Sequence, residues 1–84
     1  MGRSYRTRPK KLGAKLKRIR LRLGLTQPDM IKALNVRNEP LHPTNISAYE
    51  RNKREPPLLV VLRYAKLAGV SVESLIDDKM KLPD

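Results

Sequence analysis

The sequence predicts an all-α domain of five short helices. Apolar residues recur at intervals of three and four in successive stretches, whereas no stretch alternates apolar and polar residues as a half-buried strand does. Gly, Asn or Pro residues follow these stretches, as is typical where helices end. A chain of 84 residues has room for one domain with one core. We place that domain at residues 12–78, after a basic arm at residues 1–11 and before a short polar tail at residues 79–84.

The first helix is expected from Leu12, with a C-terminal stop at Gly24. Its apolar stripe consists of Leu12, Leu16, Ile19 and Leu23. A parallel basic stripe consists of Lys11, Lys15, Arg18 and Arg22. Like charges four residues apart weaken an isolated helix, so packing or a bound phosphate must compensate.

The second helix is expected from an N-cap at Thr26 to about Leu34. Asp29 stands three residues after Thr26, which is a variant of the capping box, and Pro28 is tolerated in a first turn. The apolar positions Met30, Ile31 and Leu34 keep helical spacing.

A third helix is expected over Thr44–Glu50, with Pro43 well placed for its first position. Its core-facing residues are Ile46 and Tyr49, which lie three residues apart. Residues 35–43 show no periodicity and are interpreted as a loop. Residues 51–57 end the helix, because Asn52 readily adopts the left-handed C′ conformation and two prolines forbid continuation.

Two more helices complete the prediction. The fourth runs over 58–68 and closes at Gly69, and the fifth starts at the N-cap Ser71. The fifth uses Val72, Leu75 and Ile76 as its apolar face. In the fourth we assign Leu58, Val61, Leu62, Ala65 and Ala68 to the core. Val60, Tyr64 and Leu67 remain as a second apolar stripe.

The charge distribution indicates a polyanionic partner. The chain has 19 Lys and Arg residues against 8 Asp and Glu, a formal net charge of +11, and no acid precedes Asp29. A solvated face is the ordinary explanation of a charge run, but this one-sided excess favours nucleic acid or an anionic membrane. Residues 1–11 contain almost no apolar side chains, so we expect a disordered basic arm that carries Arg3, Arg6 and Arg8.

Several functional classes are disfavoured by composition. The chain has no Cys and one His, and no nucleophile stands beside a partner base, so we expect no metal, no cofactor and no enzyme. No apolar run is long enough to cross a bilayer and no secretory signal is present, so we expect a cytoplasmic protein. Single-strand binding needs exposed aromatic residues, and the chain has only three Tyr and no Phe or Trp.

Four motifs resemble the Cro/C1-type (XRE-like) helix-turn-helix family over about residues 12–78. They are Leu23-Gly24-Leu25-Thr26-Gln27, Ile46-Ser47-Ala48-Tyr49-Glu50, Asn52-Lys53-Arg54-Glu55-Pro56 and Ala68-Gly69-Val70-Ser71-Val72-Glu73-Ser74-Leu75. The resemblance implies a compact five-helix domain like that of lambda repressor. It also implies a DNA-binding transcriptional regulator, a repressor, whose third helix lies in the major groove of double-stranded DNA.

The resemblance also implies the site residues. Thr44, Asn45 and Ala48 fall on the groove-facing positions, with Ser47 as a flanking candidate. Gln27 is expected to contact phosphate at the start of the second helix. Lys53 and Arg54 are expected to bind phosphate from the loop after the third helix, and the basic arm to wrap the duplex or enter a minor groove.

Structural roles for these residues stay open. Asn45 is a polar residue of an early helical turn, and Thr44 becomes the cap itself if Pro43 lies outside the helix. Gln27 is alternatively an exposed first-turn residue. His42 is a bystander or an alternative cap.

Tyr49 is expected to pack half-buried, and Glu50 to pair with a basic neighbour. The turn of the motif is usually about 3–4 residues long. Residues 35–43 exceed this, so either the second helix extends or the turn contains an insertion.

The second apolar stripe of the fourth helix predicts a partner. A homodimer is expected, because two-fold dimers on palindromic half-sites suit this motif. Burial under the loop or tail is the plain alternative. A protein-interaction module, antitoxin-like or phage-regulatory, is the second function class, and it would use the same apolar face.

Overall fold

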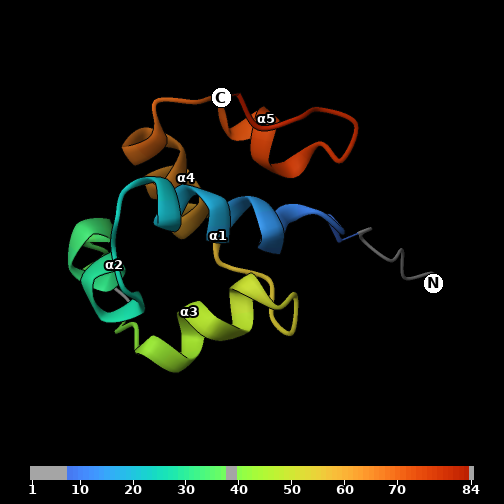
Figure 1. The fold of residues 1–84 in the computed structure, drawn as a ribbon. Helices are drawn as coiled ribbons and strands as arrows, with labels where there is room; N and C mark the ends of the chain where they lie inside the picture. Colours follow the sequence, from blue (N-terminus) through green and yellow to red (C-terminus); the bar gives the residue numbers. More distant parts are fainter. Residues whose placement is uncertain (1–7, 38–39, 84) are drawn as a thin grey trace.

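The computed structural model describes residues 8–37 and 40–83, and within these ranges it contains only helices and no strand (Figure 1). The helices are α1 (Leu12–Arg22), α2 (Gln27–Leu34), α3 (Pro43–Glu50), α4 (Leu58–Ala68) and α5 (Val72–Ile76). The all-α prediction is confirmed. Figure 1 shows α1 crossing the middle of the domain, with α3 on one side and α5 on the other. In the described residues α1 contacts α3, α4 and α5, and α2 packs against α3 and α4.

The predicted helix ends are confirmed for α2, α4 and α5. The Thr26 hydroxyl accepts the Asp29 N–H at 3.2 Å, and the Asp29 carboxylate accepts the Thr26 N–H at 3.3 Å, which completes a capping box. These hydrogen bonds to Thr26 lower the pKa of Asp29. Ser71 caps α5 by accepting the N–H of Ser74. Gly69 ends α4 with a φ of 68°, the left-handed conformation that glycine adopts without a steric cost.

The start of α3 decides between the alternatives for Thr44 and His42. Pro43 occupies the first turn and His42 is the N-cap, so Thr44 lies inside the helix. The Asn45 side-chain oxygen accepts the His42 N–H at 2.9 Å. Asn45 therefore has a structural role at this helix end in addition to any contact with a ligand.

The connection between α2 and α3 is longer than an ordinary turn of this motif. Helix α2 ends at Leu34, where Asn35 takes the left-handed conformation with a φ of 50°, and α3 begins at Pro43. Residues 35–42 remain as the connection, against about 3–4 residues in the usual motif. Helix α2 does not extend beyond Leu34, which rules out the first of the two explanations for the long connection.

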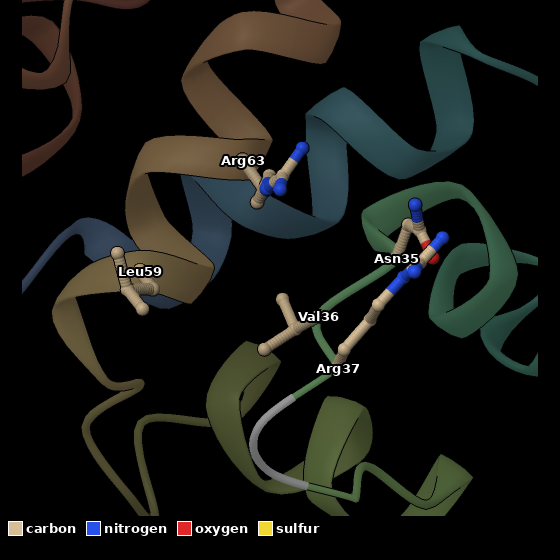
Figure 2. A pocket seen from close by; sticks show the side chains of 5 residues that line it. All are labelled: Asn35, Val36, Arg37, Leu59 and Arg63. Carbon is tan, nitrogen blue, oxygen red and sulfur yellow. The ribbon is translucent and has the colours of Figure 1, made fainter.

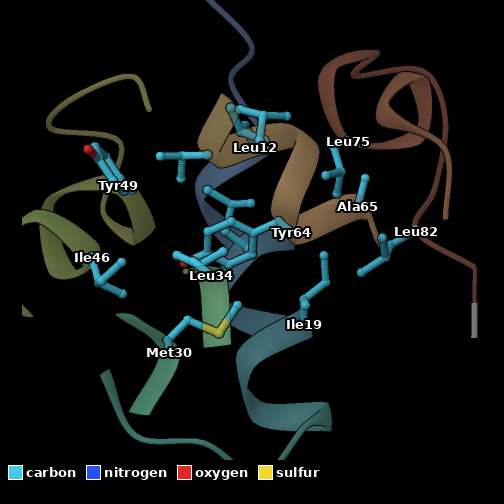
Figure 3. Packing of buried hydrophobic residues seen from close by; sticks show 13 residues of the cluster. Leu12, Ile19, Met30, Leu34, Ile46, Tyr49, Tyr64, Ala65, Leu75 and Leu82 are labelled. Carbon is cyan, nitrogen blue, oxygen red and sulfur yellow. The ribbon is translucent and has the colours of Figure 1, made fainter. Parts of the chain in front are cut away.

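The core is centred on Tyr64 of α4, and Figure 3 shows this ring surrounded by side chains from the other helices. Tyr64 and Val60 are at most 1% exposed, whereas Leu58 is 81% exposed and Leu62 36%. The predicted face of α4 was therefore wrong at these four positions, whereas Val61 and Ala65 are buried as predicted. The buried face is the one that carries Val60, Val61, Tyr64 and Ala65.

The predicted basic stripe of α1 was also wrong at Lys15, because this residue is buried. Its side chain is 6% exposed. The ammonium group donates to the carbonyl oxygens of Ser74 at 2.7 Å, Met80 at 2.8 Å and Asp77 at 3.0 Å, and lies 3.5 Å from that of Leu75. A cation suits this place, because the carbonyl groups at a helix C-terminus carry partial negative charge.

Two apolar assignments at helix ends were also wrong. Leu23 is 39% exposed because it follows the last residue of α1, and Ile76 is 47% exposed at the end of α5. The tail contributes to the core instead, since Leu82 is only 4% exposed. The C-terminal segment thus belongs structurally to the domain.

Candidate nucleic-acid interface

A buried ion pair fixes the C-terminal end of α3 against α1. Arg20 Nε donates to one Glu50 carboxylate oxygen at 2.6 Å and Nη2 to the other at 3.0 Å, while Nη1 donates to the Leu25 carbonyl at 2.9 Å. The hydrogen bond to Glu50 raises the pKa of Arg20. Glu50 thus pairs with a residue thirty positions earlier, not with a sequence neighbour. A bidentate pair of this kind sets the orientation as well as the position of α3.

The outward face of α3 carries three of the four predicted groove residues. Ile46 and Tyr49 are buried on the inner face, and Tyr49 is 6% exposed, which confirms that it packs in the core. Thr44, Ser47 and Ala48 keep the spacing of one helical face on the opposite side. Arg51 continues that face and is exposed, and sequence reasoning missed it. Its spacing of seven from Thr44 was the signal that could have identified it.

Asn45 lies toward a different side of α3. It lines a small cleft of about 190 Å³ together with Arg54, Tyr49 and the end of the connection at Pro40 and Leu41. The structure thus brings one predicted base-reading residue beside one predicted phosphate-binding residue. Asn45 does not share the outward face with Thr44, Ser47 and Ala48.

Gln27 stands at the start of α2, close to the C-terminal end of α3. Its side-chain amide donates to the Glu50 carboxylate at 3.4 Å. The N–H of Asp29 donates to the Thr26 hydroxyl, and Pro28 has no N–H group. The backbone N–H of Gln27 is therefore the donor of the first turn that can bind an anion. The negative charge of Asp29 opposes an anion at this helix end.

The loop after α3 presents two exposed basic side chains, Lys53 and Arg54. The N–H of Lys53 donates to the Ala48 carbonyl at 2.8 Å, so the loop is tied to the helix. Asn52 takes the predicted left-handed conformation, with a φ of 57°. This confirms the predicted end of α3.

Of the predicted basic arm over residues 1–11, the structure describes residues 8–11. Arg8 is exposed, whereas Arg3 and Arg6 lie outside the described residues. The N–H groups of Lys10 and Lys11 donate to the Asp78 carboxylate at 2.9 and 3.0 Å. Main-chain contacts with the domain therefore begin at Lys10, two residues before the boundary predicted from the sequence.

A second hollow lies between the connection and α4. It measures about 410 Å³ and is lined by Asn35, Val36, Arg37, Leu59 and Arg63 (Figure 2). No predicted DNA-contact residue lines it.

Across the described ranges, no group of three or more His, Cys, Asp or Glu side chains could hold a metal ion. No helix in the same ranges has the length and apolar character needed to cross a membrane.

Comparison with known proteins identifies the family. A sequence model of the helix-turn-helix family matches residues 16–75. The HTH-type transcriptional regulator ImmR of Bacillus subtilis (strain 168) is 35% identical over 65 residues, which cover 77% of this chain and 47% of ImmR. The chain thus spans about half the length of this relative.

The fold also has a solved counterpart. The P22 c2 repressor, crystallised in complex with a synthetic operator, superposes with a TM-score of 0.66 at 24% sequence identity, and the match covers 80% of this chain and 94% of that one. The family match includes α2, the long connection and α3. On this evidence the chain belongs to the helix-turn-helix family of the Cro/C1 type.

Proposed function

We propose that this chain is a sequence-specific, double-stranded DNA-binding transcriptional regulator, acting in the cytoplasm as a repressor, with α3 in the major groove. One observation carries the proposal. The outward face of α3 holds small and polar side chains, exposed basic residues follow directly after it, and a buried ion pair fixes the helix behind them. Such a surface can enter the groove and bind its phosphate edges at the same time.

Base contacts are assigned to Thr44, Ser47, Ala48 and Asn45. A Thr hydroxyl or methyl group, a Ser hydroxyl and an Ala methyl group suit the edges of several bases, and an Asn amide can bind adenine bidentately. Asn45 uses its oxygen at the His42 N–H. It would therefore have to share that oxygen or change its rotamer to bind adenine in this way.

Phosphate contacts are assigned to Gln27, Lys53, Arg54 and Arg8, together with Arg3 and Arg6 of the arm. Arg8, Lys53 and Arg54 are exposed. The net charge of +11 favours association with a polyanion. The names of the two similar proteins, a transcriptional regulator and a repressor crystallised with its operator, support the same proposal.

The test is selection of bound duplexes from a random pool, followed by titration of the selected duplex at several salt concentrations. We expect one enriched sequence, and a slope of log affinity against log salt that corresponds to about six to ten phosphate contacts. Enrichment of no sequence would reduce the activity to non-specific binding. Absence of binding at low salt would overturn the proposal.

A homodimer is the second part of the proposal, and its surface differs from the stripe predicted on α4. An apolar groove of about 720 Å³ is lined by Pro9, Leu12, Glu55, Pro56, Pro57, Leu58, Val61 and Ile76. Leu58 and Ile76 are 81% and 47% exposed. A second copy of the chain would cover these side chains and place two α3 helices on two half-sites.

Sedimentation of the wild type and of Leu58→Ser tests the dimer. We expect the wild type to dimerise on DNA and Leu58→Ser to bind as a monomer. Leu21→Ser is the matched control, because Leu21 is 58% exposed on α1 and does not line the groove. A strict monomer both free and on DNA would remove the dimer. A stable stoichiometric complex with a different protein through the same groove would favour the antitoxin-like or phage-regulatory alternative.

A further inference from the structure

Asn52 makes contacts that the end of α3 does not require. Its left-handed conformation needs only a residue that tolerates a positive φ, and glycine does so at the least steric cost. The Asn52 amide in addition donates to the Lys10 carbonyl at 2.7 Å and accepts the Gly13 N–H at 3.1 Å. One side chain thus holds the backbone on both sides of the first residue of α1.

These two hydrogen bonds place two basic segments side by side. Residues 8–11 and residues 51–54 are far apart in the sequence, yet the Lys10 backbone lies within hydrogen-bond distance of the Asn52 side chain. We call the two segments together the joined basic segments. Their basic side chains are all exposed: Arg8, Lys10, Lys11, Arg51, Lys53 and Arg54.

The charges in the joined basic segments repel one another, so their proximity must be maintained by other contacts. Asp78 holds Lys10 and Lys11 by their N–H groups from the C-terminal side. Asn52 supplies the tie to the exit of α3. A phosphate backbone beside α3 would supply the counter-charge for both segments at once.

We infer that Asn52 is a positioning residue for DNA binding: its side-chain amide fixes residues 8–11 against the exit of α3, so that both segments contact the same phosphate backbone. This inference rests on the proposed function. If Asn52 only stabilised the start of α1, its loss would lower stability without changing the number of phosphate contacts.

The test uses the full chain and a short DNA duplex of arbitrary sequence, because non-specific binding reports phosphate contacts directly. Asn52→Gly keeps the left-handed backbone and removes both side-chain hydrogen bonds. We expect the slope of log affinity against log salt to fall by about one to three. Ser71→Gly is the matched control, because it removes the cap of α5 and changes no charge.

A coupling experiment makes the test specific. Substitution of Lys10 and Lys11 by Ser should lower the salt slope in the wild type and have a much smaller effect in Asn52→Gly. Circular dichroism checks that the variants fold. If Asn52→Gly does not fold, Asn52→Asp replaces it, since the carboxylate keeps an acceptor for the Gly13 N–H and loses the donor to Lys10. The substitution of Lys10 and Lys11 is then again expected to change the salt slope much less than in the wild type.

The outcomes separate the inference from the proposed function. The inference alone would be overturned by an unchanged slope in the Asn52 variant, a full effect of the Lys10 and Lys11 substitution in that variant, and normal binding by the wild type. An equal fall of slope in Ser71→Gly would overturn it too, because the effect would then follow from stability. Failure of the wild type to bind any duplex would overturn the proposed function itself.

Discussion

The ammonium group of Lys15 lies 2.7 Å from the carbonyl oxygen of Ser74, in the last turn of α5. Further carbonyl oxygens, those of Asp77 and Met80, converge on the same nitrogen at 3.0 and 2.8 Å. A tethered cation thus binds several main-chain acceptors of the C-terminal segment. The C-terminal segment depends on a side chain of the first helix.

Lys15→Met tests this relationship. Methionine keeps most of the aliphatic stem but leaves the carbonyl groups without their donor, so we expect a loss of about 2–3 kcal/mol in the free energy of unfolding. Lys17→Met is the matched control on the exposed side of α1, with an expected change of about 0.5 kcal/mol or less. Urea denaturation measures both. Equal effects would show that the carbonyl contacts do not contribute.

Gly13→Ala tests the close approach of α1 and α3. A Cβ atom at Gly13 would lie 2.7 Å from the carbonyl oxygens of Tyr49 and Glu50. The expected overpacking cost of about 1–3 kcal/mol exceeds the gain in helix propensity of about 1 kcal/mol. Thermal or urea denaturation should therefore show a less stable protein, and a more stable one would contradict the packing. Gly69→Ala offers a comparison, since it meets open space and is opposed only by its positive φ.

Asn45→Asp separates base recognition from helix capping. The carboxylate can still accept the His42 N–H, so we expect no loss of stability. An Asp side chain accepts from cytosine but cannot donate to adenine. Selection of bound duplexes should therefore show an adenine preference in the wild type that changes toward cytosine in the variant. An unchanged consensus would assign Asn45 to capping alone.

Tyr64→Phe tests a buried hydroxyl group. The Tyr64 side chain is fully buried, and its hydroxyl has no hydrogen-bond partner among the described residues. Burial raises the pKa of this phenol, so the group stays protonated at ordinary pH. Removal of an unsatisfied hydroxyl should leave stability unchanged or raise it by about 1 kcal/mol. Tyr64→Ala, which also removes the ring, should cost about 3–5 kcal/mol, and a loss of that size in Tyr64→Phe would contradict the assignment.

The Asp78 carboxylate is expected to cause part of the loss of stability in acid. Hydrogen bonds from the Lys10 and Lys11 N–H groups lower the pKa of Asp78 in the folded state. Because the pKa of Asp78 is lower in the folded than in the unfolded state, its contribution to the free energy of unfolding is complete above the unfolded pKa of about 3.9. It is then lost as the pH falls through the folded value. Asp78→Asn should therefore show a shallower loss of stability below about pH 4, measured by urea midpoints across this range, and parallel curves would contradict the role of Asp78.

The helix boundaries could be predicted because each depends on local chemistry. Thr26 and Ser71 act through a side-chain hydrogen bond to the N–H three positions ahead, and Gly69 acts through its own backbone and carbonyl groups three or four positions back. Such contacts leave a clear pattern in the sequence. The same holds for Asn52, whose left-handed conformation ends α3.

The errors arose where a residue has a distant partner. Lys15 has the spacing of an exposed stripe, and only the return of residues 74–80 to α1 makes its position buried. Tyr64 and Leu62 both fit an apolar face of α4, and the space between the other helices determines which one enters the core. Partners of this kind cannot be read from periodicity. The pairing of Glu50 with Arg20 is a further example.

If α3 reads DNA as proposed, the long connection between α2 and α3 bears on how such a domain can acquire a new target sequence. Helix α2 ends at the left-handed residue Asn35 and α3 begins at the cap His42, so residues 36–41 supply neither helix end. Val36 and Leu41 pack against the core, so changes of length between these two residues would leave both helix ends in place. Under the proposed function, the connection is thus a natural position for evolution, or for an engineer, to tilt α3 while the framework behind it stays the same.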